Sequence, residues 1–131
     1  MEDGEFLTGK MLIAMPGMSD PRFERSVIYM CAHSEEGAMG IVINKPMGAL
    51  RLPDLLSQIG IESSILAPQN PVLRGGPVDQ ARGFVLHTND YEVEDATYAI
   101  SPGISLTATK EVLNALASPT PPERAVLALG Y

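Results

Sequence analysis

The sequence contains few of the residues on which disulfide-bonded and metal-binding proteins depend. Cys31 is its one cysteine, which excludes an internal disulfide framework and fits a reducing compartment. The two histidines, His33 and His87, occur without a CxxC, HExxH or EF-hand pattern. We therefore expect neither a metal ion nor another cofactor.

Lysine and arginine are also scarce, at nine residues against 16 Asp and Glu, so the formal net charge is −7. The nine cations are scattered along the chain, and an acidic surface repels phosphate backbones. Direct nucleic-acid binding is therefore expected to be absent. A nucleic-acid-binding regulator would have to use cations such as Arg22, Arg25 and Arg51.

Long apolar runs are missing as well. No run approaches the roughly 18 residues that a transmembrane helix requires. The first residues, MEDGEFLTGK, carry three acids, which is the wrong charge for a signal peptide. We expect a cytoplasmic protein without a membrane partner.

With 131 residues, of which 45% are hydrophobic, the chain is long enough for one domain, residues 1–131, with its own core. Leu52, Leu55, Leu56 and Ile59 recur at helical spacing, which predicts a helix that Gly60 ends. A second helix is predicted over TKEVLNALAS, capped by Thr107 or Thr109 and apolar at Val112, Leu113, Leu116 and Ala117. Short apolar runs predict strands at residues 11–15, 26–33, 38–44, 71–78 (ending in a Gly-Gly-Pro turn), 83–87, 97–103 and 123–131.

Strands outnumber helices in this pattern, and most connections are too short for repeated βαβ crossovers. The sequence therefore predicts an α/β (α+β) fold with a mixed, largely antiparallel sheet and two packed helices.

The stretch CAHSEEGAMGIVINKP, residues 31–46, predicts a β-hairpin. A two-residue turn at Glu35 and Glu36 would pair His33 with Ala38, and side chains would then alternate between two faces. The expected core face carries Ile28, Met30, Ala32, Met39, Ile41 and Ile43, and the opposite face carries Tyr29, Cys31, His33, Gly40, Val42 and Asn44.

Cys31 and His33 could belong to a thiol enzyme, since a catalytic thiol needs a base close by. Two residues apart on one strand, however, their side chains would run parallel about 7 Å apart. The neighbouring Glu35 and Glu36 also disfavour a thiolate. The favoured interpretation is a half-buried structural cysteine, and no catalytic residue is assigned.

The segment RGGPV, residues 74–78, offers a different chemistry. Consecutive glycines can turn successive amides toward an anion, and Arg74 would add a positive charge. No phosphate-loop pattern accompanies it, so a tight turn with close backbone packing at Gly75 and Gly76 is the favoured alternative.

The segment LIAMPGMSDPRFERSVIYMCAHSEEGAMGIVINKP, followed in order by RGGPV, GFVLH, ISLTATKEVLNALA and LGY, resembles the AlgH/YqgE family of small bacterial proteins. The resemblance implies a compact α/β domain with a strongly bent sheet, a pseudo-barrel. It also implies a mostly uncharacterised protein, named after a regulator of alginate production. The family pattern continues beyond Tyr131, so we expect this chain to lack a C-terminal segment and to expose a surface suited to self-association.

These observations favour a non-enzymatic cytoplasmic binding or regulatory protein, AlgH-like, that acts through a protein partner or a small ligand. The alternative is a hydrolase or transferase in which His33 works with Asn44, Cys31 or His87. The residues expected to bind a ligand are His33, Asn44, Arg74, Gly75, Gly76 and His87.

Overall fold

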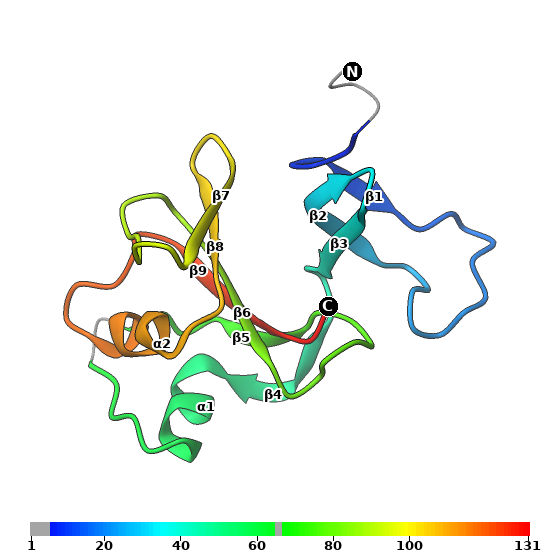
Figure 1. Cartoon of the computed structure of the whole chain (residues 1–131). Helices are drawn as coiled ribbons and strands as arrows, with labels where there is room; N and C mark the ends of the chain where they lie inside the picture. The colour runs from blue at the N-terminus through cyan, green and yellow to red at the C-terminus, as the bar shows by residue number, and fades with distance from the viewer. Residues whose placement is uncertain (1–5, 65–66) are drawn as a thin grey trace.

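The computed structural model describes residues 6–64 and 67–131, and its strands lie in two sheets (Figure 1). The smaller sheet has the strand order β1-β2-β3 and the larger sheet β4-β5-β9-β6-β8-β7, in which only β5 and β9 pair in parallel. The elements are β1 (Met11–Ile13), β2 (Val27–Ser34), β3 (Gly37–Val42), β4 (Pro46–Arg51), α1 (Leu52–Gln58), β5 (Pro71–Arg74), β6 (Gly83–His87), β7 (Thr97–Ser101), β8 (Ile104–Thr107), α2 (Lys110–Ala117) and β9 (Ala125–Leu129).

This arrangement confirms the predicted α/β class, with a largely antiparallel strand pattern and two helices. The two sheets meet at one corner, where the amide of Val42 donates a hydrogen bond to the carbonyl oxygen of Gly75 at 2.8 Å. The chain passes directly from β3 into β4 at this corner. In place of the single strongly bent sheet that the family resemblance implies, the strands are divided between two sheets that meet here.

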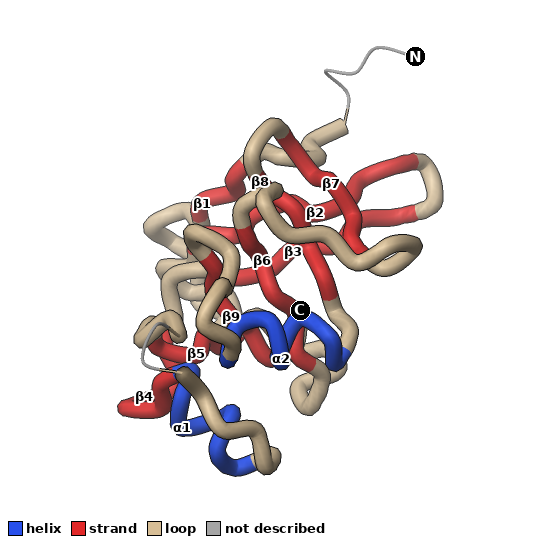
Figure 2. Tube along the Cα trace, turned by 90° about the vertical axis from the view of Figure 1, so that its left-hand side faces the viewer, coloured by secondary structure: helices blue, strands red, loops and turns tan. Residues whose placement is uncertain are grey.

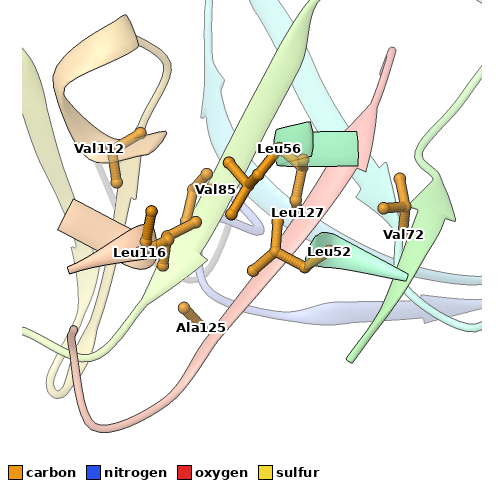
Figure 3. Close-up of a cluster of buried hydrophobic side chains, with 9 residues drawn as sticks. Leu52, Leu56, Val72, Val85, Val112, Leu116, Ala125 and Leu127 are labelled. Carbon is orange, nitrogen blue, oxygen red and sulfur yellow. The ribbon is translucent and has the colours of Figure 1, made fainter. Parts of the chain in front are cut away.

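The larger sheet separates two apolar cores, because successive side chains of its strands point to opposite faces. Val85 and Leu127 lie on the face covered by the two helices, and Figure 3 shows them among the buried side chains of that core. Phe84 and Leu86, each one residue away from Val85 on β6, pack instead with residues of β2 and β3. The protein is therefore layered as helices, large sheet and small sheet. Figure 2 views the molecule from the side on which α2 lies.

Both helices form where the apolar spacing predicts them. In α1 Leu52 and Leu56 are buried, and Asp54 accepts a hydrogen bond from the amide of Arg51 at 3.1 Å, which caps the helix. Ile59, expected on the apolar side, is 49% exposed because α1 ends at Gln58. Neither described helix is long and apolar enough to cross a membrane.

The predicted hairpin forms with the expected turn, since Ser34 pairs with Gly37 and His33 with Ala38. The expected core face is wrong for β2, because a bulge at Cys31 shifts the register between Met30 and Ala32. Tyr29 now lies opposite Ile41 and joins the core, whereas the prediction placed Met30 there. The bulge leaves the prediction correct on β3, where Ile41 is fully buried.

Two strands are absent from the prediction. β4 begins at Pro46 and includes Gly48, two residues that are uncommon within strands, and it lies at the edge of the large sheet, where Pro is tolerated. β8 follows β7 after a turn at Pro102 and Gly103, so the predicted strand 97–103 is the first arm of a hairpin whose second arm was not predicted. The prediction drawn from the acidic N-terminus depends partly on residues 1–5, which lie outside the described ranges.

Candidate functional site

A cavity of about 370 Å³ lies between the two sheets. Its walls are almost entirely apolar, and they come from strands of both sheets and from the turn between β7 and β8. Its polar groups lie at one end, where Thr88 and Arg124 meet. The residues that line it are Met11, Tyr29, Ile43, Leu73, Leu86, His87, Thr88, Gly103, Ile104, Arg124, Ala125 and Val126.

The register of the large sheet explains the apolar wall. Leu86 pairs with Val126 across β6 and β9, so both side chains lie on the face toward the small sheet. Tyr29 contributes from the opposite sheet, and its hydroxyl group is paired with the Ser101 hydroxyl at 2.8 Å. The tyrosine therefore presents its ring to this region while its polar end is satisfied.

Thr88 holds the polar end of the cavity together. Its amide donates to the carbonyl oxygen of Arg124 at 3.0 Å, and its hydroxyl group donates to Asp90 at 2.5 Å. Asp90 also accepts from the amide of Glu123 at 2.9 Å. These hydrogen bonds to the Thr88 hydroxyl and the Glu123 amide lower the pKa of the Asp90 carboxyl. The backbone of Arg124 is thereby held beside Thr88, and within the described part of the chain its guanidinium has no carboxylate partner.

His87 borders the cavity, but its imidazole lies on the other face of the sheet, where it contacts Tyr91. Its Nδ1 is 2.8 Å from the carbonyl oxygen of Thr88 and its Nε2 is 2.8 Å from the Thr107 hydroxyl oxygen. A carbonyl oxygen only accepts, so Nδ1 carries the proton and Nε2 accepts from Thr107. Thr97 in turn is 2.7 Å from Thr107 and accepts from the Val93 amide. Both nitrogens of His87 are therefore engaged in a buried hydrogen-bond chain.

His33 and Asn44 serve local structure. The Nδ1 atom of His33 accepts a hydrogen bond from the amide of Leu7 at 2.9 Å, and its ring contacts Phe6 edge-on. The side chain of Asn44 accepts from the Val27 amide and donates to the Arg25 carbonyl oxygen, both at 2.9 Å. These two predicted ligand-binding residues share no partner with each other or with His87.

Arg74, Gly75 and Gly76 lie together at the end of β5, as their sequence requires. The amide of Gly75 donates to the carbonyl oxygen of Leu129 at 2.9 Å, so it is engaged with β9. Gly76 packs directly against the main chain of Tyr131. The pair thus forms the closely packed turn that the sequence offered as an alternative, while Arg74 remains exposed at the surface.

A family model described as AlgH-like, DUF179, matches residues 11–131 of the chain. The chain belongs to the AlgH-like family. Among curated relatives in this family, a UPF0301 protein of Caulobacter vibrioides is 50% identical over 99% of the chain, and one of Bradyrhizobium diazoefficiens is 55% identical over 96% of it. The chain spans 67% and 62% of these relatives' own lengths, respectively.

The AlgH-like fold is also known from solved structures. The solution structure of the AlgH protein from Pseudomonas aeruginosa aligns with all of this chain and 69% of that protein, at a TM-score of 0.76 and 37% identity. Protein DIP2367 from Corynebacterium diphtheriae shares the fold at a TM-score of 0.68, with 19% identity over 99% of this chain and 67% of its own. The predicted family is thus confirmed.

Cys31 of this AlgH-like chain lacks the exposure and the low pKa that a catalytic thiol needs. Its side chain is fully buried at the β2 bulge, and its Sγ lies 3.7 Å from the carbonyl oxygen of Tyr29. Burial raises the pKa of the Cys31 thiol to about 11, because the charged thiolate is poorly solvated there. No group of three or more His, Cys, Asp or Glu residues that could hold a metal ion occurs in the described ranges.

Alkylation of Cys31 by iodoacetamide at mildly alkaline pH is expected to be roughly 100-fold slower in the folded protein than in guanidinium chloride. The thiolate fraction falls about tenfold for each unit by which the pKa rises, and burial of the sulfur slows access further. Mass spectrometry of timed samples measures both rates. Equal rates would show that the thiol is accessible and ionisable in the folded state.

Sequence reasoning missed the cavity and Arg124. The cavity is lined by apolar residues from strands far apart in the sequence, each of which reads as an ordinary core residue. Arg124 belongs to a short polar stretch before β9 and carries no recognisable motif. Only the pairing of β6 with β9 brings it beside Thr88.

Proposed function

We propose that this AlgH-like protein is a non-enzymatic binding protein that holds a small, mainly apolar molecule between its two sheets. The observation that carries this proposal is the inter-sheet cavity of about 370 Å³. Pockets for small organic ligands have volumes of about 300–1,000 Å³, mostly apolar walls and a few placed polar groups. The cavity meets each of these conditions, with Thr88 and Arg124 as its polar end.

The chemistry of the wall selects the ligand class. Leu73, Leu86 and Val126 would remove an apolar body from water, which is the main source of affinity in such a site. A single hydroxyl or carboxylate group on the ligand would fit the end of the cavity beside Arg124. A strongly polar ligand such as a free sugar would lose its hydration against these walls without replacement hydrogen bonds.

A regulatory role would follow from the position of the cavity between the sheets, because an occupant contacts both and biases their arrangement. A protein partner or a second copy of the chain would find exposed apolar side chains on and after β1, where Met11 is 56% exposed and Ile13 and Met15 are each 74% exposed. The net charge of −7 supports a protein or small-molecule partner over nucleic acid, and the one buried free cysteine suits a cytoplasmic location.

The hydrolase or transferase alternative has less support. It requires His33 to meet a nucleophile or Asn44, whereas His33 contacts Phe6 and Leu7. Cys31, the thiol that the sequence offered as a partner of His33, is held as a neutral thiol by burial. The binding proposal uses the cavity without requiring either residue to move.

The proposal is tested by an NMR titration with octanol as the probe. We expect saturable chemical-shift changes centred on Leu86 and Val126, the paired residues of the wall. Val126→Phe should weaken octanol binding by roughly tenfold, because the larger ring occupies part of the cavity and covers apolar wall that octanol would otherwise contact. Ile13→Phe is the matched control, since Ile13 is exposed and lies outside the cavity.

Equal affinity of Val126→Phe and Ile13→Phe would contradict the proposal. Shifts confined to Ile13 and Met15, which are exposed and lie outside the cavity, would assign octanol to the exposed surface instead. A circular dichroism melt of Val126→Phe confirms that the variant is folded before its affinity is compared.

A further inference from the structure

A second pocket, of about 290 Å³, lies at the corner where the two sheets meet. It shares no lining residue with the inter-sheet cavity. Three of the nine lysines and arginines of the chain line it, while no acidic residue does. In a protein with a net charge of −7 this is a local concentration of positive charge. The lining residues are Pro21, Arg22, Val42, Lys45, Arg74, Gly76, Pro77 and Gln80.

Two of these cations are placed directly opposite each other by the register of β4 and β5. Pro46 pairs with Leu73 in this antiparallel ladder, so the next step of the ladder sets Lys45 against Arg74. The amide of Arg74 indeed donates to the carbonyl oxygen of Lys45 at 2.7 Å. Residues paired in this way place their side chains on the same face, within about 5.5 Å at the Cβ atoms. Like charges in this position repel each other.

Within the described part of the chain, Lys45 and Arg74 have no carboxylate partner that would offset this repulsion. The third cation, Arg22, is bound by Asp20 through its Nε and Nη2 atoms, the latter at 2.7 Å. That ion pair lowers the pKa of the Asp20 carboxyl to about 2, so Asp20 stays charged and occupied with Arg22. Two unneutralised cations therefore face one pocket.

The backbone adds a further donor. Gly76 lines the pocket, its main chain is buried, and its amide donates to no group among the described residues. Buried amides are nearly always hydrogen-bonded in folded proteins. An anion in the pocket would accept from this amide while it neutralises Lys45 and Arg74.

We propose that the corner pocket lined by Lys45, Arg74 and Gly76 binds the phosphate group of a small phosphorylated molecule. The double negative charge of a phosphate group balances the two cations, and its several oxygens suit an ammonium, a guanidinium and an amide together. The enclosed volume accommodates a phosphate with a small organic group, whereas a nucleic-acid duplex offers its phosphates along an extended backbone.

The test is a thermal melt and an NMR titration of this chain with inorganic phosphate, at constant ionic strength held with sodium chloride. We expect saturable shifts at Lys45, Arg74 and Gly76 and a melting temperature that rises with phosphate concentration, since a ligand that binds the native state stabilises it. Lys45→Gln and Arg74→Gln should each weaken phosphate binding by roughly tenfold, the equivalent of one charge-assisted hydrogen bond.

Lys10→Gln is the matched control, because Lys10 is exposed and lies outside the pocket. It removes the same charge and should leave phosphate binding unchanged. Without phosphate, Lys45→Gln and Arg74→Gln should melt no lower than the parent, since each removes a repulsion. Equal losses of affinity in all three variants, or an effect of phosphate equal to that of chloride, would overturn the proposal. The last titration uses acetate at the same ionic strength. If acetate binds as tightly as phosphate, the pocket is a carboxylate site and the proposal is overturned.

Discussion

Replacing Gly76 with alanine is expected to lower the free energy of unfolding by about 4 kcal/mol, a large share of the 5–15 kcal/mol typical of a domain. A Cβ atom at this position would overlap the carbonyl group of Tyr131 and lie 2.9 Å from its Cα atom. The obstacle is main chain, which cannot rotate away as a side chain can. Gly76 also has a φ of +157°, which L side chains rarely adopt.

The damage would extend beyond Gly76, because Tyr131 and Val78 exchange two backbone hydrogen bonds of 2.8 and 2.9 Å. Displacing Tyr131 to make room for a methyl group would stretch both. Urea denaturation followed by circular dichroism measures the loss. Gly17→Ala is the control, since no atom lies within 4 Å of its Cβ position and its backbone needs no unusual φ. A loss no larger than that of Gly17→Ala would show that the chain end at Tyr131 yields freely.

The hairpin shows how far local sequence determines this fold. The turn at Glu35 and Glu36 is predictable because the apolar alternation on both sides fixes its position. The bulge at Cys31 is not, because its consequence is tertiary: it turns Tyr29 toward the large sheet, where its hydroxyl group meets that of Ser101, 72 residues away. No pattern within the hairpin contains that contact.

The candidate sites follow the same rule. The sequence presents His33, Asn44 and His87 as candidate ligand-binding residues. Their polarity is used in hydrogen bonds to the backbone of Leu7, Val27, Arg25 and Thr88, and to the Thr107 hydroxyl group. Such partners depend on which segments the fold brings together, so the sequence alone does not reveal these hydrogen bonds.

Arg74 illustrates the opposite case. Its positive charge is visible in RGGPV, but its significance depends on Lys45, which faces it only because β4 pairs with β5. That strand was missed, since Pro46 and Gly48 disfavour strand formation within a sheet. An edge strand that forms because a neighbouring strand pairs with it is hard to predict from its own sequence. The contacts of the residues that it positions are then equally hard to predict.

The second large effect is expected in the helix-covered core. Leu56→Ala should reduce the free energy of unfolding by about 3–5 kcal/mol, because it removes a fully buried side chain and leaves a cavity. Leu56 lies on the inner side of α1 in the same cluster as Val72 of the sheet and Leu116 of α2 (Figure 3). These three side chains belong to three different elements, so none of them can shift alone to fill the cavity that alanine leaves. Urea denaturation with a two-state fit measures the change.

Ile59→Ala, just after the end of the same helix, shows whether the loss of stability comes from burial or simply from shortening an apolar side chain. It also shortens an aliphatic side chain, but Ile59 is 49% exposed and its amide, which closes α1 by donating to Leu55 and Leu56, is retained in alanine. Its cost should therefore stay below about 1 kcal/mol. Similar losses of stability for Leu56→Ala and Ile59→Ala would contradict the prediction, because burial of Leu56 would then contribute nothing beyond the shortening of an apolar side chain. A loss concentrated in Leu56 places its stabilisation in the contact between α1, α2 and the strands, as the layered arrangement requires.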